Sequence, residues 1–150
     1  HAECMLFIAP LLVDSPETKR RLIGECGLDR LLDAAKSLDL AIISCGDLAT
    51  EEGSMGLGIL DQRDRTEILE SGAICDVCCN FLNGEGNDVA HPVQERLMTT
   101  DLETISNARH VVLASGGSQR AAAIRAAILR TGCNTLVTDE SAAQTLLELP

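Results

Sequence analysis

Short apolar runs alternate along the chain with segments in which hydrophobic residues recur at helical spacing. The apolar runs predict buried strands over residues 4–9, 39–46, 73–82, 109–115 and 134–138. Helical spacing predicts a helix after Ser15, helices over 28–38 and 61–71, a short helix opening at 100–103, and helices over 118–131 and 141–149. Strands that alternate with helices are typical of a layered α/β fold in which helices flank a mainly parallel sheet.

Polar residues, glycine and proline mark where these elements end. Ser15 and Pro16 predict a helix start, because serine is a good N-cap and proline suits the first helical position. Gly132 predicts the end of the helix over 118–131, and either Asp139 or Ser141 caps the last helix. Residues 46–58 hold four glycines without a hydrophobic period and predict a long loop.

A turn-forming segment, residues 83–88, follows the predicted strand over 73–82. The apolar residues of Val93–Met98 come shortly after it. This order predicts a hairpin in which residues 93–98 pair back on the strand before the turn.

The charge and composition narrow the function classes. The 150 residues include 12 Lys and Arg against 23 Asp and Glu, which gives a net charge of −11, and 45% are hydrophobic. The size and the apolar content predict one domain with a core of its own. Such an acidic surface repels a phosphate backbone, so direct DNA binding by these residues is excluded. Phe7 and Phe81 are the only aromatic residues of the Phe, Tyr and Trp types, so a ligand must be held mainly by polar groups.

The cysteines indicate a reducing compartment. Their number, seven, is odd, their spacing is irregular, and no signal-like apolar segment opens the sequence. We therefore expect free thiols and a cytoplasmic protein. No apolar run approaches the roughly 20 residues that a membrane helix needs, so we expect no membrane span.

The strongest chemical signal is the predicted strand, Gly116-Gly117 turn and helix. A glycine turn before a helix lets backbone N–H groups converge on an anion. Arg120 falls in the first helical turn, where a cation faces the positive end of the helix dipole, and a bound anion would resolve that conflict. The alternative is that Arg120 pairs with an internal carboxylate such as Glu140.

Asp76 is the second candidate, because it places a carboxylate inside an apolar predicted strand. A pair of sugar hydroxyls could satisfy it. The alternative is that Asp76 points outward from a half-exposed edge strand.

Cys75 and Cys78 form a C-x-x-C, but in a strand they face opposite sides of the sheet, and no second ligand pair completes a zinc site. We therefore expect these cysteines to act as small buried hydrophobes. His91 and His110 are interpreted as structural residues, and no nucleophile, base and acid triad can be assembled.

Several segments, taken in order, resemble the sugar-binding domain of SorC-like bacterial transcriptional regulators. The family has a Gly-Ala-x-Gly-Asp strand, an Asn-x-Arg segment, a Leu-Glu-Asp-Leu turn, an Ala-Gly-Gly-x-x-Lys-Ala turn and a Thr-Asp-Glu ending. The matching segments here are residues 72–76, 94–96, 100–103, 114–124 and 138–143, with further likeness at Ala9-Pro10-Leu11 and over 39–46.

The resemblance implies a three-layer α/β fold related to ribose-phosphate isomerase, glucosamine-phosphate deaminase and the CoA transferases. It also implies an effector domain that binds a phosphorylated sugar or polyol, in which Asp76 contacts hydroxyls and Arg120 stands where the family has a phosphate-contacting lysine. Cys75 and Cys79 replace family glycines and narrow the space around Asp76. The predicted ligand-binding set is Asp76, Gly116, Gly117, Ser118, Arg120, Gly46 and Cys78, with no catalytic residue, metal or cofactor.

The family's N-terminal helix-turn-helix and first phosphate loop have no counterpart in these residues. We therefore interpret residues 1–150 as the C-terminal portion of an effector domain, with DNA contacted by a separate domain and a dimer or tetramer as the expected assembly. Two alternatives stay open. One is an oligomerisation module without ligand binding. The other is a sugar-phosphate isomerase or deaminase, for which Asp47 or Glu51 would be the base, since Lys19 and Lys36 fall on predicted amphipathic helices.

Overall fold

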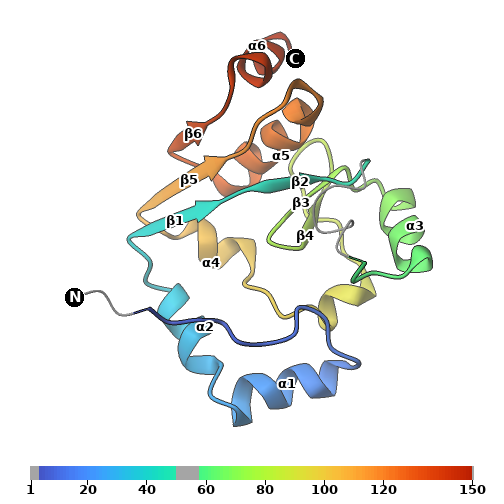
Figure 1. Cartoon of the computed structure of the whole chain (residues 1–150), viewed down its shortest axis with the longest axis vertical. Helices are drawn as coiled ribbons and strands as arrows, with labels where there is room; N and C mark the ends of the chain where they lie inside the picture. The colour runs from blue at the N-terminus through green and yellow to red at the C-terminus, as the bar shows by residue number, and fades with distance from the viewer. Residues whose placement is uncertain (1–3, 50–57, 150) are drawn as a thin grey trace.

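The computed structural model describes residues 4–49 and 58–149 and shows helices and strands in alternation (Figure 1). The α-helices are α1 (Pro16–Glu25), α2 (Asp29–Ala35), α3 (Gln62–Glu70), α4 (Leu102–Ser106), α5 (Ala121–Thr131) and α6 (Glu140–Glu148). The strands are β1 (Leu40–Ile43), β2 (Cys45–Asp47), β3 (Cys75–Val77), β4 (Asn80–Leu82), β5 (His110–Ala114) and β6 (Thr135–Val137). Two short 3-10 helices are η2 (Pro92–Glu95) and η3 (Ser118–Arg120).

The strands form two sheets that share one extended stretch of chain. A parallel sheet has the order β1-β5-β6, and an antiparallel sheet has the order β2-β3-β4. Only Ser44 separates β1 from β2, so the chain leaves the first sheet and enters the second without a loop. The predicted three-layer α/β class, with a parallel sheet flanked by helices, is confirmed, while the relation to the isomerase, deaminase and CoA transferase folds stays a prediction.

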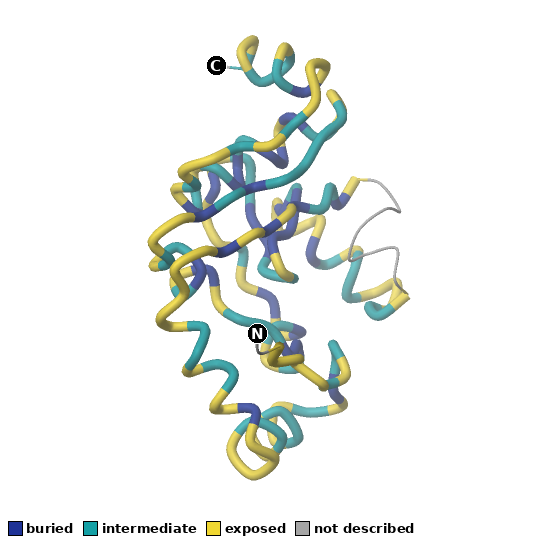
Figure 2. Tube along the Cα trace, turned by 60° about the vertical axis from the view of Figure 1, so that its left-hand side comes forward, coloured by how far each residue is buried: buried dark blue, intermediate teal, exposed yellow. Residues whose placement is uncertain are grey.

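The main core lies where α4 and α5 pack against the strands. Ala41 and Ile43 of β1 are buried in it together with Val111 and Leu113 of β5, to which they are paired in register. Side chains alternate along a strand, so the residues between them face the other way. Leu40 and Ile42 are accordingly 50% and 70% exposed. Buried residues gather in the middle of the molecule, while α1 and α2 at one end and α6 at the other are largely exposed or half-buried (Figure 2).

The predicted helix ends are confirmed. Ser15 caps α1 by accepting a hydrogen bond from the Thr18 N–H, and Pro16 occupies the first helical position. Gly132 ends α5 in the left-handed conformation with φ of 59°. Of the two candidate caps for α6, Asp139 is the cap, since its carboxylate accepts from the Ala142 N–H.

The strand predicted over residues 4–9 is wrong. Met5, Leu6 and Ile8 are exposed, and the Ile8 and Ala9 N–H groups bond to carbonyls two residues earlier in the chain rather than to a neighbouring strand. Apolar composition alone does not make a strand, because a strand also needs a partner to pair with. The strand predicted over 39–46 is two strands, β1 and β2, in different sheets. The predicted loop after Gly46 begins only after Asp47, and residues 50–57 lie outside the described residues.

The predicted strand over 73–82 is a hairpin, in which β3 and β4 flank a two-residue turn. Cys78 and Cys79 form this turn with φ of 50° and 61°, the positive values that a tight hairpin turn requires. Such turns usually have the sequence Asn-Gly, so a turn made of two cysteines is not predicted from the sequence. The predicted returning strand over 93–98 is also wrong, because Pro92 begins η2 there and β4 is the partner of β3.

The two neighbouring isoleucines of β1 test which face of the parallel sheet is packed. Ile43 is 8% exposed and Ile42 is 70% exposed. We expect Ile43→Ala to lower the free energy of unfolding by about 2–5 kcal/mol, because it leaves a cavity in the core. Ile42→Ala should change it by no more than about 0.5 kcal/mol. Urea denaturation measures both values, and equal losses would mean that the face bearing Ile42 is covered in solution.

Candidate functional site

Polar residues and glycines follow all three strands of the parallel sheet at its carboxyl edge. Ser44 follows β1, Ser115 and Gly116 follow β5, and Thr138 and Asp139 follow β6. Ligands of open α/β sheets bind outside the carboxyl ends of the strands. The carboxyl edge of the parallel sheet is therefore the candidate site.

Asp76 lies at the centre of β3 and is only 5% exposed. Its register partner in β2 is Gly46, and its Oδ2 accepts a hydrogen bond from the Cys79 N–H at 3.0 Å. The hairpin turn makes this bond possible, because the left-handed backbone at Cys79 turns the amide back toward β3. The alternative in which Asp76 points outward from a half-exposed strand is wrong.

Cys45, the first residue of β2, lies between the candidate groups. Burial raises the pKa of its thiol, the nearby Asp76 carboxylate raises that pKa further, and the Arg120 guanidinium lowers it. Both charged residues are thus close enough to Cys45 to act on it electrostatically. Asp76 and its register partner Gly46 are far from Arg120 in sequence, yet Asp76 and Arg120 are both within electrostatic range of Cys45.

Two buried hydroxyls flank this region. The Oγ of Ser115 and the Oγ1 of Thr138 are buried, and neither makes a hydrogen bond of normal geometry to an oxygen or nitrogen of the described residues. The Cys45 thiol lies beside Ser115, but a thiol is a weak partner. Buried hydroxyls without a strong partner are uncommon, and a bound polar molecule would satisfy them.

The turn between β5 and η3 has the predicted glycine geometry. Gly117 has φ of 93°, a backbone conformation that strongly favours glycine. The Gly117 N–H donates a hydrogen bond to Oδ2 of Asp139, at 2.5 Å. A side chain at Gly116 would collide with the same carboxylate. An internal acid therefore already binds one of the amides at which an anionic ligand was predicted.

Asp139 holds this turn and the start of α6 at the same time. Its Oδ1 accepts from the Ala142 N–H at 3.0 Å and from the Ser141 hydroxyl at 2.6 Å. Bonds from Ser141, Ala142 and Gly117 lower the pKa of Asp139 to about 2, so the carboxylate is ionised at neutral pH. Sequence reasoning found its capping role but missed the bond to Gly117. The strand order could have indicated this bond. The parallel strands β5 and β6 end at the same edge of the sheet, which places Asp139, shortly after β6, beside the turn after β5.

Among the other predicted ligand residues, Ser118 begins η3 and is exposed, while Arg120 ends η3 and is half-buried. The alternative, in which Arg120 pairs with Glu140, stays a prediction. Cys78 lies away from this turn, at the tip of the hairpin. It lines a largely apolar cavity of about 390 Å³ together with Ile43 and Thr100, and the lining does not include residues 116–120.

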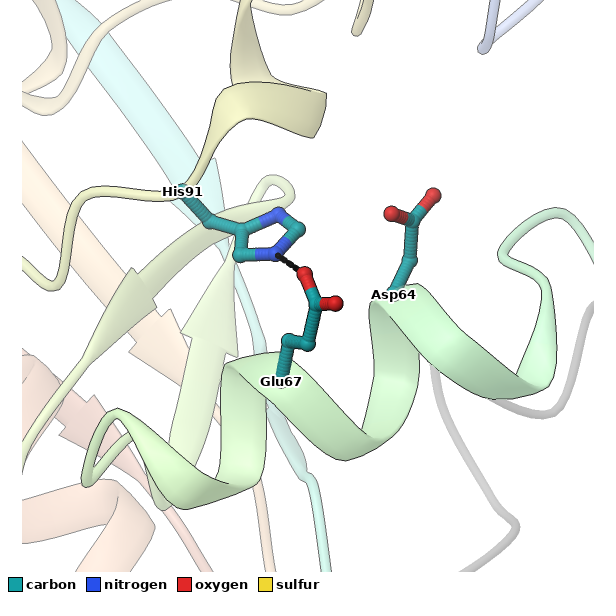
Figure 3. Close-up of side chains that lie close together, drawn as sticks. All are labelled: Asp64, Glu67 and His91. Atoms are coloured by element: carbon teal, nitrogen blue, oxygen red, sulfur yellow. Dashed lines mark hydrogen bonds and ion pairs between the residues drawn. The ribbon is translucent and has the colours of Figure 1, made fainter.

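A second polar cluster consists of Asp64 and Glu67 of α3 together with His91 (Figure 3). Each side chain offers one atom that could bind a metal ion, and these atoms lie within 4.8 Å of one another. His91 is a buried cap of η2, and its Nδ1 accepts a hydrogen bond from the Val93 N–H. Its Nε2 therefore carries the proton and faces Oε2 of Glu67 at 3.4 Å, so it offers no lone pair to a metal. The carboxylates also pair with arginines, Asp64 with Arg96 and Glu67 with Arg63. This cluster fastens α3 to η2, which supports a structural role for His91.

The cysteines are free, as expected. Cys75 is fully buried, and burial raises the pKa of its thiol to about 12. Burial likewise raises the pKa of Cys79 to about 11. Both thiols are neutral at physiological pH. Cys75 is the small buried group that was predicted, whereas Cys79 is half-buried and the prediction is wrong for Cys78, which the hairpin turn leaves exposed.

Among the residues considered for an isomerase or deaminase, those that the structure describes make local or surface contacts. Asp47 accepts a hydrogen bond from the Ala49 N–H at 2.8 Å, and Glu51 lies outside the described residues. Lys19 donates to the Gln94 carbonyl, and Lys36 pairs with Asp33 on the surface of α2. Neither lysine is placed to assist a base at the strand ends.

A family described as "Putative sugar-binding domain" matches residues 1–148, and the chain belongs to that family. The predicted SorC-like resemblance is thereby confirmed. The chain is 29% identical over 153 residues to the transcriptional regulator LsrR of Klebsiella pneumoniae, a match that covers 99% of the chain and 47% of the relative. It is 22% identical over 138 residues to the deoxyribonucleoside regulator of Bacillus subtilis, covering 92% of the chain and 44% of the relative. These relatives are regulators by name.

Solved structures give the same fold. The full-length sorbitol operon regulator SorC of Klebsiella pneumoniae superposes with a TM-score of 0.90 at 22% identity, over 97% of this chain and 47% of that one. A sugar-binding domain of a transcriptional repressor from Vibrio fischeri gives a TM-score of 0.83 at 22% identity, over 94% of this chain and 56% of that one. The chain therefore spans about half the length of the relatives it matches.

Within the described residues, every helix is too short or too polar to cross a bilayer.

The lowered pKa of Asp139 predicts a pH dependence of stability. Its pKa of about 2 lies below the ordinary 3.8, so the stabilisation is present above pH 3.8 and is lost as the pH falls through about 2. Asp139→Asn removes the charge but keeps an oxygen that can cap α6. We expect the difference in free energy of unfolding between the two proteins to shrink across this window in urea denaturation. A difference that stays constant across it would contradict the assignment.

Proposed function

We propose that this domain binds a phosphorylated sugar or polyol and acts as the effector-sensing part of a transcriptional regulator. The observation that carries the proposal is that a buried carboxylate, Asp76, and the guanidinium of Arg120 both lie near the thiol of Cys45. A ligand with hydroxyls at one end and a negative charge at the other matches both groups. Family membership over residues 1–148 supports the same ligand class.

The sugar end of the ligand is assigned to Asp76. One carboxylate oxygen accepts from the Cys79 amide, and an ionised carboxylate has further lone pairs that hydroxyl groups can use. A buried charge is costly unless it is hydrogen-bonded, so ligand hydroxyls would stabilise it. The hydroxyls of Ser115 and Thr138 offer additional hydrogen bonds at the same edge of the sheet.

The phosphate end is assigned to Arg120 and the turn at Gly116, Gly117 and Ser118. A guanidinium presents donors in a planar fork and binds phosphate through two hydrogen bonds, which a lysine does not. The acidic net charge of −11 disfavours free anions at the surface in general, so a local cation matters for attracting one.

The names of three relatives suggest the range of ligands to try. They are the deoxyribonucleoside regulator of Bacillus subtilis, the erythritol catabolism regulatory protein of Brucella abortus and the sorbitol operon regulator of Klebsiella pneumoniae. These names point to four-carbon and six-carbon polyols and to a deoxyribose derivative. In our proposal the bound ligand shifts the balance between oligomeric states, and a separate domain contacts DNA.

A ligand panel with point variants tests the assignment. Phosphates of erythritol, deoxyribose, ribose, glucose and sorbitol are titrated in a thermal-shift assay, and the dissociation constant of the best one is measured by calorimetry. We expect Arg120→Ala to weaken that ligand about tenfold or more, because it loses a charge-assisted hydrogen bond. Asp76→Asn should weaken the sugar phosphate while leaving inorganic phosphate unchanged, since Asp76 is assigned to hydroxyls.

Arg130→Ala is the matched control, because Arg130 lies on α5 and pairs with Asp88 rather than with the site. It should bind like the wild type. If Arg120→Ala and Arg130→Ala bind the best ligand equally, the phosphate assignment is wrong. If no phosphate in the panel shifts the wild type, the sugar-phosphate proposal itself fails.

A further inference from the structure

Asp139 occupies the amide of Gly117, at the turn to which the ligand's phosphate is assigned. We propose that Asp139 is an internal competitor for that phosphate and that its displacement passes the binding event to helix α6. The inference rests on the proposed function, because it concerns how the same ligand enters the same site.

The bond from Gly117 is additional to what a helix cap needs. A cap requires one oxygen to accept from the amides of the first turn, and Oδ1 of Asp139 does this for Ala142. The second oxygen reaches the Gly117 N–H, 22 residues away in sequence. The carboxylate thus stands where an anionic ligand would accept the same hydrogen bond, with Arg120 at the end of the following turn of 3-10 helix.

A phosphate and this carboxylate exclude each other. Both are negatively charged, and only one acceptor can take the Gly117 hydrogen in a short, straight bond. A phosphate that is also held by Arg120 has a cationic partner in addition to the Gly117 amide, whereas for Asp139 the Gly117 bond is one of three, beside those from Ala142 and Ser141. The ligand can therefore accept the hydrogen bond from the Gly117 amide only when the Asp139 carboxylate moves away from it.

Helix α6 is built to respond to that movement. It lies at one end of the molecule, beyond β6 (Figure 1). Ala142 is fully buried and Leu146 packs against the main core, while Leu147 is 87% exposed. Because Ala142, in the first turn of α6, is packed in the main core, a movement of the Asp139 cap acts directly on the packed start of the helix. The residues of α6 that follow the cap are then a route from the ligand to a surface outside the site.

Asp139→Asn separates competition from capping. The amide oxygen can still accept from Ala142, but the amide NH₂ is a donor and cannot accept from Gly117, so the turn is released. Asp101→Asn is the matched control, since Asp101 caps α4 by accepting from Thr104 and removes the same charge from the protein. Inorganic phosphate is the probe, measured by NMR titration of the 150-residue chain.

We expect Asp139→Asn to bind inorganic phosphate on the order of tenfold more tightly than the wild type, a size common for coupling between two ligands. Asp101→Asn should bind like the wild type. In the wild type, saturating phosphate should also speed hydrogen exchange at the Ala142 amide, whose acceptor moves.

Two results overturn the inference, and they differ. If Arg120→Ala weakens phosphate but Asp139→Asn and the wild type bind it equally, competition by Asp139 is wrong while the proposed function stands. If neither protein binds inorganic phosphate or any phosphate of the panel, both proposals fail together. Tighter binding by Asp101→Asn to the same degree as Asp139→Asn would reduce the effect to net charge and would also overturn the inference.

Discussion

The arrangement of the candidate site depends on one structural constraint, the passage of a single extended segment through two sheets. Strand β1 is held in the parallel sheet by β5, and β2, which begins two residues after β1 ends, is held in the antiparallel sheet by β3. Ser44 is the only residue between them. Because the segment has no loop to absorb a change of direction, the carboxyl edge of one sheet is fixed against the register of the other. Gly46 and Asp76 therefore lie in strands that pack against α5, the helix that follows Arg120, although no local sequence feature connects them.

This constraint explains which parts of the fold could be predicted. Helices whose starts and ends are decided by nearby residues, such as α1 with Ser15 and α5 with Gly132, were correct because caps act over a few positions. Strands depend on partners that may be distant. The apolar run over 4–9 has no partner strand in the described chain, and the run over 73–82 pairs with itself through a turn made of two cysteines. Hydrophobic pattern alone does not distinguish these cases.

The site was predictable to the same extent. Asp76 and Arg120 were predicted as ligand contacts because each breaks a local rule: a charge in an apolar strand, and a cation at a helix start. Their roles stay predictions. The contact between Gly117 and Asp139 breaks no local rule, since glycine suits a turn and aspartate suits an N-cap. Their bond follows only from the strand order, in which β6 lies beside β5. A residue that satisfies every local preference can therefore hold a second, long-range role that its sequence surroundings do not reveal.

Arg120 places a positive charge at a helix start, and the free protein already holds an anion at the same turn. A cation there was expected to need an anion, and Asp139 supplies an ionised carboxylate to the same turn before any ligand arrives. The Gly117 amide therefore already has an anionic acceptor in the unliganded state. The consequence is a lower apparent affinity, because a ligand must first remove an anion that is tethered to α6. In our proposal, a site that contains its own anion binds a ligand more weakly than an empty site would. The arrival of the ligand, however, changes a contact of the neighbouring helix α6, which binding to an empty site would leave unchanged.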